Sequence, residues 1–434
     1  MWLDWFINVA MSCKILNGET MNLKNQMIYQ VYVRNHTAEG TFKALLSDLD
    51  RIKALGTDIV HFLPIHPIGV VNRKGTLGSP YSISDYRAIN PEYGTIGDFR
   101  LLVDTMHQKG LKVMIDVVYN HTSHDSVLIE RFPDSYLRNA AGEVIPKVAE
   151  WWDIADLIHN SDALQEELID TLVYWAKLGV DGFRTDVASL VPLSFWRKAD
   201  TAVRAVNPDN VWLAETIDPH FAAQMKKQSA IYETDSDLYE IYDIEYSYDT
   251  YAIQKEYYEG KRPLKDFVEA MKFQEFYLPI YANKLRFLEN HDQVRFMSFG
   301  LDPVMHTSML FFLKGTTLIY AGQESLNDHL PSLFDKDTID LSNEGITSLI
   351  QTLASIKKDP IFAEGSYELQ VVDECLIASY HRGPRTLYGI FNTKAEAVSI
   401  DLPDGSYENL IDGNTVEVIN ASIDWSKPVI LDIT

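Results

Sequence analysis

The run Val180-Asp-Gly-Phe-Arg-Thr-Asp186 places a cation and a carboxylate where a short apolar segment ends. Its apolar residues predict a buried strand. Residues two apart project from the same face of a strand, so Arg184 and Asp186 should lie together. A guanidinium beside a carboxylate favours the ionised form, which is the form that can act as a nucleophile. The alternative is a structural ion pair that closes the strand, and this run alone does not separate the two.

Other apolar runs end in residues of the same chemical kind. One ends in Glu215, and another ends in Glu289-Asn-His-Asp292. A further run contains Asp116, Asn120 and His121. If the carboxyl ends of these strands converge, Asp186, Glu215 and Asp292 meet at one point. Buried charge of one sign is expensive, and stability alone gives no reason for gathering it. The pattern therefore predicts a catalytic site built on carboxylates.

The overall charge narrows the range of partners. The 434 residues include 62 acidic and 38 basic residues, a formal net charge of -24. Nucleic acids and anionic membranes bind basic surfaces, so both are poor partners for this chain, and a neutral substrate fits better. No apolar run approaches the roughly 20 residues of a membrane helix. The two cysteines, Cys13 and Cys375, give neither a disulfide framework nor a metal-ligand spacing.

The first 25 residues differ from the rest of the chain. Their apolar segment is short, and no Lys or Arg precedes it, which is unlike a signal peptide. We expect residues 1–25 to be a loosely ordered leader, or an upstream start before Met21 or Met27. The expected compartment is the cytoplasm.

A repeated unit of helix, glycine and buried strand runs through most of the chain. Apolar residues at helical spacing predict helices over 41–55, 99–106 and 164–175, and Gly56, Gly110 and Gly179 end them. A buried strand follows each glycine, which is typical of a parallel sheet with covering helices. We therefore predict an α/β fold, a (β/α)8 TIM barrel over residues 26–358, with its chemistry at the carboxyl ends of the strands.

Two further regions depart from this unit. Residues 64–93 form a long loop, and residues 121–161 predict a small domain inserted after the third strand. Long loops on the active face of a barrel usually carry substrate contacts. In residues 360–434, short alternating runs are separated by turns, which predicts a C-terminal, β-sandwich-like all-β domain.

Taken together, these motifs resemble the α-amylase family of retaining glycoside hydrolases. The resemblance covers about residues 27–358 in the family's order. It rests on four inner motifs, Asp116-Val-Val-Tyr-Asn-His121, Gly182-Phe-Arg-Thr-Asp186, Trp212-Leu-Ala-Glu215 and Glu289-Asn-His-Asp292. Outer motifs that match are Ile28-Tyr-Gln-Val-Tyr32, Pro80-Tyr-Ser-Ile-Ser-Asp-Tyr86, Ile154-Ala-Asp-Leu157 and Tyr320-Ala-Gly-Gln-Glu324.

The resemblance implies a role for each acid. Asp186 would be the nucleophile, Glu215 the general acid/base, and Asp292 a third carboxylate that stabilises the transition state. Retaining glycosidases need one ionised and one protonated carboxyl about 5–5.5 Å apart. Arg184 suits the ionised role of Asp186. The apolar residues before Glu215, and the charge of Asp186, would raise the pKa of Glu215.

The resemblance also implies substrate contacts around these acids. His121 and His291 would hydrogen-bond sugar hydroxyls, although structural hydrogen bonds are an alternative for both. Tyr81 would stack on the sugar at the cleaved bond, or else pack within its loop. Asp116 would orient Arg184, with Asn120 as a further support of the site. For Trp151 and Trp152 we favour a small-domain core over sugar platforms.

Two departures from the family pattern affect substrate and metal binding. Ser189-Leu190 stands where many members have Lys-His, which puts binding of the leaving group in doubt. Calcium is a possible cofactor, with Asn120 and Asp156 as weak candidate ligands. Calcium takes 6–8 oxygens, and two candidates do not make a site. The inserted region is short, so we expect an open cleft.

The resemblance implies hydrolysis of α-1,4-glucosidic bonds in maltodextrin-like or starch-like α-glucans, with retention. Three alternatives stay open. The first is an α-glucan transglycosylase, since water and a sugar acceptor can use the same covalent intermediate. The second is an α-glucosidase specific for α-1,6 bonds or for disaccharides. The third is a non-catalytic carbohydrate-binding protein, which predicts the loss of at least one of the three acids.

Overall fold

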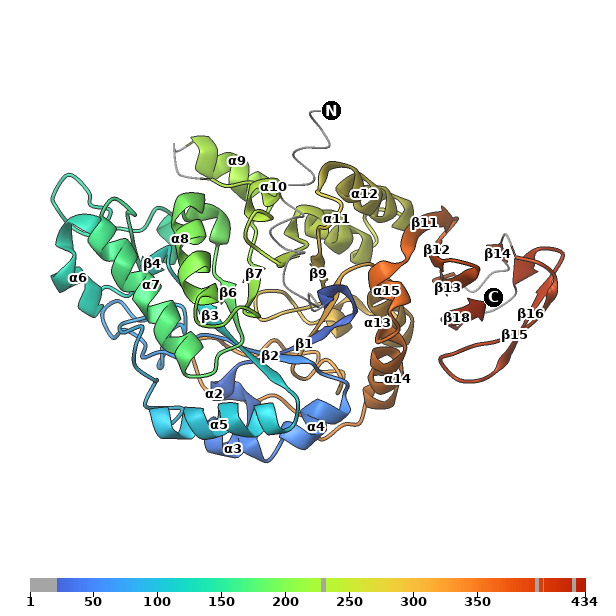
Figure 1. Ribbon diagram of the computed structural model, residues 1–434, viewed down its shortest axis with the longest axis horizontal. Coiled ribbons are helices and arrows are strands. Elements are labelled where there is room, and N and C mark those ends of the chain that lie inside the picture. Colours follow the sequence, from blue (N-terminus) through green and yellow to red (C-terminus); the bar gives the residue numbers. More distant parts are fainter. Residues whose placement is uncertain (1–21, 228–231, 395–397, 401, 424–426) are drawn as a thin grey trace.

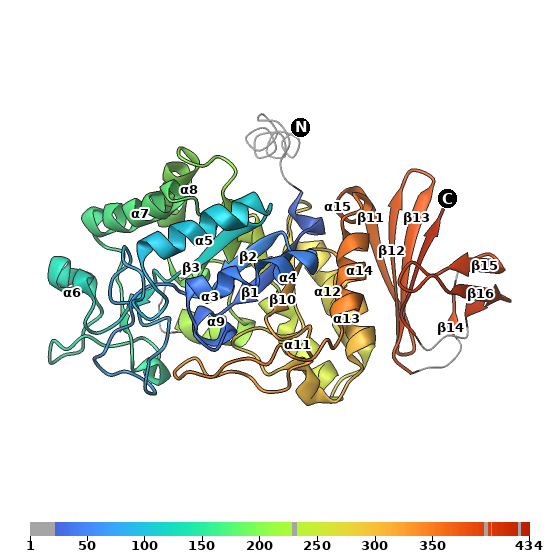
Figure 2. The same ribbon diagram turned by 90° about the horizontal axis from the view of Figure 1, so that it is seen from below.

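Eight parallel strands close into a barrel in the computed structural model, which describes residues 22–227, 232–394, 398–400, 402–423 and 427–434. The barrel order is β1-β10-β9-β8-β7-β6-β3-β2, and the helices lie around it (Figures 1 and 2). The strands are β1 (Met27–Val31), β2 (Ile59–Phe62), β3 (Lys112–Val117), β6 (Gly182–Thr185), β7 (Val211–Ala214), β8 (Ile244–Tyr246), β9 (Lys284–Arg286) and β10 (Thr316–Tyr320). The predicted (β/α)8 barrel is confirmed.

The strands form because both of their faces are buried. In β1, Ile28 packs inside the barrel and Tyr29 packs outward against the helices, as the two-residue repeat of a strand requires. The aliphatic side chains inside the barrel include Ile28, Ile59, Met114, Leu213, Ile244, Leu285 and Leu318. Parallel strands covered on both faces are usually continuous apolar runs, as β7 is, but β6, β8 and β9 also bury the charged residues Arg184, Glu245, Lys284 and Arg286.

The helices cover the outside of the barrel. They are α2 (Val33–His36), α3 (Phe42–Leu46), α4 (Leu49–Ala54), α5 (Ile96–Gln108), α7 (Asp162–Lys177), α8 (Leu193–Arg204), α9 (Pro219–Lys227), α10 (Asp235–Leu238), α11 (Tyr248–Tyr258), α12 (Leu264–Tyr277), α13 (Pro303–Phe312), α14 (Thr347–Lys357) and α15 (Ile361–Glu364). Gly110 and Gly179 follow α5 and α7 with positive φ, as the sequence predicts.

The helix predicted over 41–55 is two helices, α3 and α4. The Ser47 hydroxyl donates to the carbonyl of Ala44, at 2.7 Å, where α3 ends. The Asp48 carboxylate, between the two helices, lies 2.6 Å from His36 Nε2 and accepts a hydrogen bond from Arg51 of α4 at 2.7 Å. Short polar side chains that bond locally in this way compete with a continuous helix.

The region after β3 contains little regular structure. Its strands β4 (His121–Thr122) and β5 (Ala155–Asp156) pair antiparallel, and α6 (Val127–Arg131), η2 (Pro133–Ser135) and η3 (Ala149–Trp151) lie between them. The loop after β2, predicted over 64–93, has no helix or strand, although Ile68 and Ile83 form a single bridge. Both regions lie beyond the carboxyl ends of barrel strands.

The C-terminal part is all β, as predicted, and contains two four-stranded sheets. The first comprises β11 (Ser366–Val372), β12 (Cys375–Arg382), β13 (Arg385–Asn392) and β18 (Val429–Ile433). The second comprises β14 (Val398–Ser399), β15 (Gly405–Glu408), β16 (Thr415–Ile419) and β17 (Ser422–Ile423). The Tyr380 hydroxyl donates to the Phe312 carbonyl at 3.2 Å, which joins the first sheet to α13 of the barrel.

The predicted leader of residues 1–25 lies mostly outside the described residues. Its last part is not loose, because Leu23–Asn25 form η1, which packs against the barrel. The Leu23 carbonyl accepts a hydrogen bond from the Thr316 hydroxyl at 2.7 Å, and the Asn25 amide donates to the Lys358 carbonyl at 3.3 Å. Within the described ranges, no helix has the length and apolar character needed to cross a bilayer.

These contacts predict a stability difference between two shortened chains. A chain that starts at Gln26 should melt at a lower temperature than one that starts at Asn22, because it loses η1 and its hydrogen bond to Thr316. Differential scanning calorimetry measures the difference. Equal melting temperatures would show that η1 does not stabilise the barrel.

Candidate active site

Three of the predicted site residues meet at one buried guanidinium. Arg184 on β6 donates from Nη1 to Asp116 Oδ1 at 2.9 Å and to Asp186 Oδ1 at 3.1 Å. Its Nη2 forms an ion pair with Glu215 Oε1 at 2.9 Å. Arg184 is fully buried, and Asp186 and Glu215 are 8% and 9% exposed. The carboxyl ends of β6 and β7 therefore bring the predicted nucleophile and acid to the same cation.

The register of the barrel explains this meeting. Asp116 on β3 pairs with Arg184, and Arg184 pairs with Leu213 on β7. Asp186 and Glu215 each follow the last residue of their strand, so both lie at the carboxyl edge of the sheet. As expected, Asp116 orients Arg184, because both of its oxygens accept from the same Nη1.

Asp292 joins the site through a chain of polar contacts. The Tyr81 hydroxyl donates to Asp116 Oδ2 at 3.0 Å and lies 2.5 Å from Nε2 of His291. The same His291 nitrogen lies 3.0 Å from Asp292 Oδ2. The Tyr81 and His291 rings are stacked, with centroids 5.4 Å apart and planes 12° apart. Tyr81 is thus held by Asp116 and His291, and it lines the cleft.

His121, at the start of β4, lines the same cleft. Asn120 Nδ2 is 3.1 Å from His121 Nδ1, and the Trp151 ring centroid is 6.1 Å from the His121 ring centroid. Burial lowers the pKa of His121 to about 4. The imidazole is therefore neutral near pH 7, with one nitrogen able to donate and the other able to accept a hydrogen bond.

The pKa of Asp186 differs from the expectation that Arg184 keeps this carboxyl group ionised. Burial, with the charges of Asp116 and Asp292, raises the pKa of Asp186 to about 7, although Arg184 opposes the rise. Arg184 does not hold Asp186 fully ionised, because its single charge is shared among three carboxylates. The expected rise at the acid is found: burial, with the charges of Asp186 and Asp292, raises the pKa of Glu215 to about 8.

The other two carboxylates are the ionised ones. Burial opposes the ionisation of Asp116, but the charge of Arg184 and the hydrogen bond with His61 lower its pKa below the usual value. Burial opposes the ionisation of Asp292 as well, and His291 lowers its pKa. The site therefore combines two ionised carboxylates with a coupled pair, Asp186 and Glu215, that exchanges protons near neutral pH.

Val187 is a functional residue that the sequence did not indicate. Its φ of 36° is in the left-handed region, which strongly disfavours a β-branched residue. This conformation directs the Val187 N–H to Glu215 Oε2, at 2.8 Å. A strained residue directly after Asp186 thus positions the Glu215 carboxyl group. Nothing in the local residue pattern predicts it.

The acids lie in a cleft of about 570 Å³. Besides Tyr81, His121 and the three acids, it is lined by Lys74, Ser79, Trp151, Asp153, Ile154, Val187, Thr216, Ile217, Asp218, Phe221, Tyr248, Tyr251, Ala252, Lys255, Gln293, Leu333 and Phe334. The core placement favoured for the tryptophans is wrong for Trp152, which is 49% exposed. Trp151 lines the cleft and also packs against a small apolar cluster that includes Ile217 and Met225.

The two candidate calcium ligands do not fit a metal ion. The ammonium of Lys147 lies 3.1 Å from Asn120 Oδ1 and 3.3 Å from Asp156 Oδ1. Asn120 Nδ2 also donates to Asp156 Oδ1 at 2.9 Å, and the backbone N–H of Lys147 donates to Asp156 Oδ2 at 2.5 Å. A lysine therefore supplies the positive charge, and three N–H donors, from the Asn120 side chain and from the backbone and ammonium of Lys147, occupy the carboxylate oxygens that calcium would need. Among the described residues, no group of three metal-binding side chains occurs.

The raised pKa of Glu215 predicts a pH-dependent gain in stability when its charge is removed. A pKa raised on folding stabilises the protein below the unfolded pKa, and this contribution is lost as the pH rises through about 8. Glu215→Gln has no such titration, so its melting temperature should exceed that of the wild type at pH 9, and the difference should shrink towards pH 4.5. Glu166→Gln, at an exposed position on α7, is the control. A constant difference across this pH range would contradict the shift.

The contacts of Lys147 predict indifference to calcium. Neither EDTA nor added CaCl2 should change the melting temperature, because the Lys147 ammonium already neutralises Asp156. Lys147→Ala should lower the melting temperature, because it leaves a buried carboxylate without its cation. The exposed Lys198→Ala on α8 is the matched control. A fall in the wild-type melting temperature with EDTA would show that a metal is bound.

Comparison with known proteins places this geometry in a family. The model described as "Alpha amylase, catalytic domain" matches residues 17–140 and 149–360, and "Bacterial Alpha amylase C-terminal domain" matches residues 367–431. A crystal structure of an alpha-amylase from Lactobacillus plantarum has a TM-score of 0.92 and 43% identity, covering 95% of this chain and 100% of that one. The maltogenic alpha-amylase AmyB from Thermotoga neapolitana has a TM-score of 0.84 and 32% identity, covering 95% and 100%.

Curated relatives from the same family are similar to this chain over part of their own length. Alpha-amylase MalA of Haloarcula japonica is 26% identical over 409 residues, 88% of this chain and 57% of that protein. An alpha-1,4-glucan:maltose-1-phosphate maltosyltransferase of Arcanobacterium haemolyticum is 30% identical over 198 residues, 41% of this chain and 28% of that protein. This chain thus spans little more than half of the first relative and under a third of the second. With the catalytic-domain model matched along most of its length, the chain belongs to the α-amylase family.

Proposed function

We propose that this protein hydrolyses α-1,4-glucosidic bonds of maltodextrin-like α-glucans, with retention, through a covalent glycosyl-enzyme. The observation that carries the proposal is the single guanidinium of Arg184, which contacts both Asp186 and Glu215. It holds a nucleophile and an acid side by side, which a retaining mechanism requires. The α-amylases from Haloarcula japonica and Lactobacillus plantarum support the substrate class.

The first chemical step uses the two acids in opposite protonation states. Asp186 attacks the anomeric carbon as its carboxylate, and Glu215 gives its proton to the leaving oxygen. Burial and the charges of Asp186 and Asp292 raise the pKa of Glu215, so the working state of the pair has the proton on Glu215. The Val187 N–H bound to Oε2 and the Arg184 guanidinium 2.9 Å from Oε1 hold the Glu215 carboxyl group in place. Once substrate expels water, Arg184 remains the cation beside the attacking carboxylate.

The second step reverses the proton transfer. Glu215, now ionised, takes a proton from water, which attacks the anomeric carbon and releases Asp186. The ionised Asp292, held by His291, stabilises the positive charge that develops on the sugar in both steps. Neutral His121 and the Tyr81 ring border the same space and would contact the sugar that is attached to Asp186.

A transglycosylase is the second candidate. The similarity to a maltosyltransferase over 41% of this chain favours it, because a sugar hydroxyl can replace water in the second step. Chromatography of the products from maltoheptaose separates the two. Shorter sugars alone indicate a hydrolase, and sugars longer than maltoheptaose indicate a transferase.

Variants at the two acids test the mechanism. Asp186→Asn should abolish turnover, because an amide does not attack the anomeric carbon. Glu215→Gly should still form the glycosyl-enzyme from a substrate with an activated leaving group, but should release it slowly. Added azide should restore turnover and give a glycosyl azide with the anomeric configuration of the substrate, measured by NMR. An azide product of inverted configuration, or an active Asp186→Asn, would show that the roles are wrong.

A further inference from the structure

Three loops that lie far apart in the sequence join at one end of the cleft. They are 74–78 after β2, 150–153 after β3, and 333–336 after β10. The Lys74 ammonium is 2.7 Å from Asp153 Oδ1 and 3.0 Å from the Glu150 carbonyl oxygen. It also lies over the Phe334 ring, 6.0 Å from the ring centroid. Lys74 therefore connects all three loops, which we call the loop junction.

Backbone hydrogen bonds hold two of these loops against each other. The Leu77 and Gly78 N–H groups donate to the Phe334 carbonyl, at 2.9 and 3.2 Å. Thr76 donates from its backbone and its hydroxyl to Asp335 Oδ1, at 2.8 and 2.6 Å. Gly75 has a φ of +61°, and a Cβ there would lie 2.6 Å from the Phe334 Cβ. The two loops are too close to admit even an added methyl group at this point.

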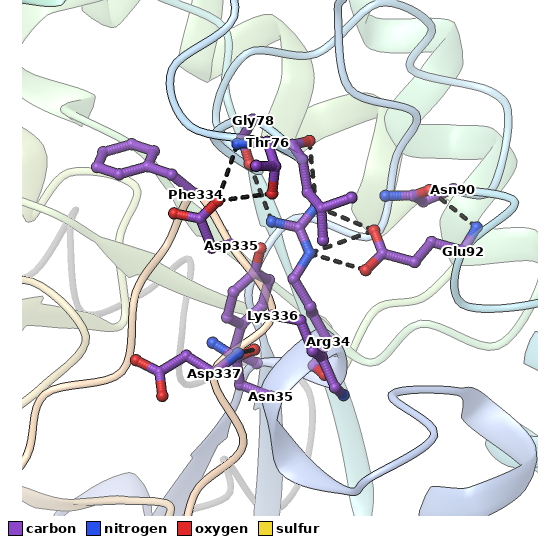
Figure 3. A network of polar contacts seen from close by, with 12 residues as sticks. Arg34, Asn35, Thr76, Gly78, Asn90, Glu92, Phe334, Asp335, Lys336 and Asp337 are labelled. Carbon is purple, nitrogen blue, oxygen red and sulfur yellow. Dashed lines mark hydrogen bonds and ion pairs between the residues drawn. The ribbon is translucent and has the colours of Figure 1, made fainter.

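The buried guanidinium of Arg34 anchors the junction from below (Figure 3). Arg34 is fully buried, binds Glu92 through two nitrogens, and donates to the carbonyls of Gly78 at 3.0 Å and Leu333 at 3.1 Å. The Phe334 ring points away from this polar network in Figure 3, and it lines the cleft. A displaced loop would leave a buried charge with fewer partners, so the junction is a rigid part of the fold.

The barrel order places the junction relative to the acids. Its loops follow β10, β2 and β3, which lie together on one arc of the barrel with β1. The acid Glu215 follows β7, and the cleft residues beyond it, Phe221 and Lys255, follow β7 and β8 on the opposite arc. The leaving group departs on the side of its proton donor. The loops that carry Lys74 and Phe334 therefore lie on the side of the sugar that becomes attached to Asp186. The 150–153 loop extends from them to the opposite arc, where the Trp151 and Phe221 ring centroids are 5.8 Å apart.

We propose that Lys74 and Phe334 close the glycone end of the cleft, so that the enzyme cuts short units from non-reducing chain ends. This inference rests on the proposed function. A glucan that passed through the cleft in both directions would have to separate Lys74 from Asp153, which is 4% exposed. A chain end needs no such opening. Lys74 and Phe334 are thus specificity determinants that favour exo action over cleavage within a chain.

The test compares two substrates that differ only at the non-reducing end. They are 4-nitrophenyl α-maltoheptaoside and the same compound with a 4,6-O-ethylidene group on its terminal glucose. Wild-type enzyme should release products from the first and fail to cleave the second. β-Cyclodextrin, which has no chain end, should also resist. Equal kcat/KM values for the free and blocked substrates would overturn the inference and leave the proposed hydrolysis intact. No cleavage of the free substrate would instead contradict the proposed function.

Substitution at the junction should open the closed end. Lys74→Ala and Phe334→Ala should raise the ratio of kcat/KM for the blocked substrate to that for the free substrate. Lys255→Ala, on α11 after β8 on the opposite arc of the barrel, is the matched control and should leave that ratio at the wild-type value. The ratio compares two substrates on one enzyme sample, so partial unfolding of a variant does not alter it. An unchanged ratio in both junction variants would overturn the inference.

Discussion

The charge of Arg184 is the interaction on which the cleft depends. One fully buried guanidinium contacts Asp116, Asp186 and Glu215, and three carboxylates around one cation leave an excess of negative charge. Removing a partner from such a cluster costs several kcal/mol, because the remaining buried charges lose their compensation. Burial and this excess of negative charge together raise the pKa values of Asp186 and Glu215.

Much of this arrangement could be predicted because it is built from strand ends. Asp186, Glu215 and Asp292 each follow an apolar run, and a closed parallel barrel must bring such positions to one edge. The side-chain repeat of a strand also fixes which face carries Arg184. A shift of one residue in the pairing of β3 and β6 would turn Arg184 away from Asp116 and towards the helices. Local pattern and barrel geometry therefore specify the same site.

The parts that could not be predicted depend on contacts between distant loops or on balances between opposing charges. Nothing near Lys74 in the sequence indicates that Asp153 and Phe334 are its partners, because these contacts depend on how three separate loops fold against one another. The positive φ of Val187 is imposed by its surroundings against its own preference. That Arg184 contacts three carboxylates could be recognised only from the interatomic distances in the structure. Trp152 was misplaced because an aromatic residue in a small loop region has the same local sequence pattern whether it packs in a core or is exposed.

Lys147 changes how the region beside His121 responds to its surroundings. A bound metal ion stabilises a fold by an amount that depends on its free concentration, so the fold weakens when the ion becomes scarce. The Lys147 ammonium is covalently part of the chain, so it stays beside Asn120 and Asp156 however dilute the protein solution is. The polar contacts that Lys147 makes with Asn120 and Asp156 therefore form in every folded chain and do not depend on the metal content of the solution. Its loss requires a mutation, whereas the loss of a metal requires only a competing ligand.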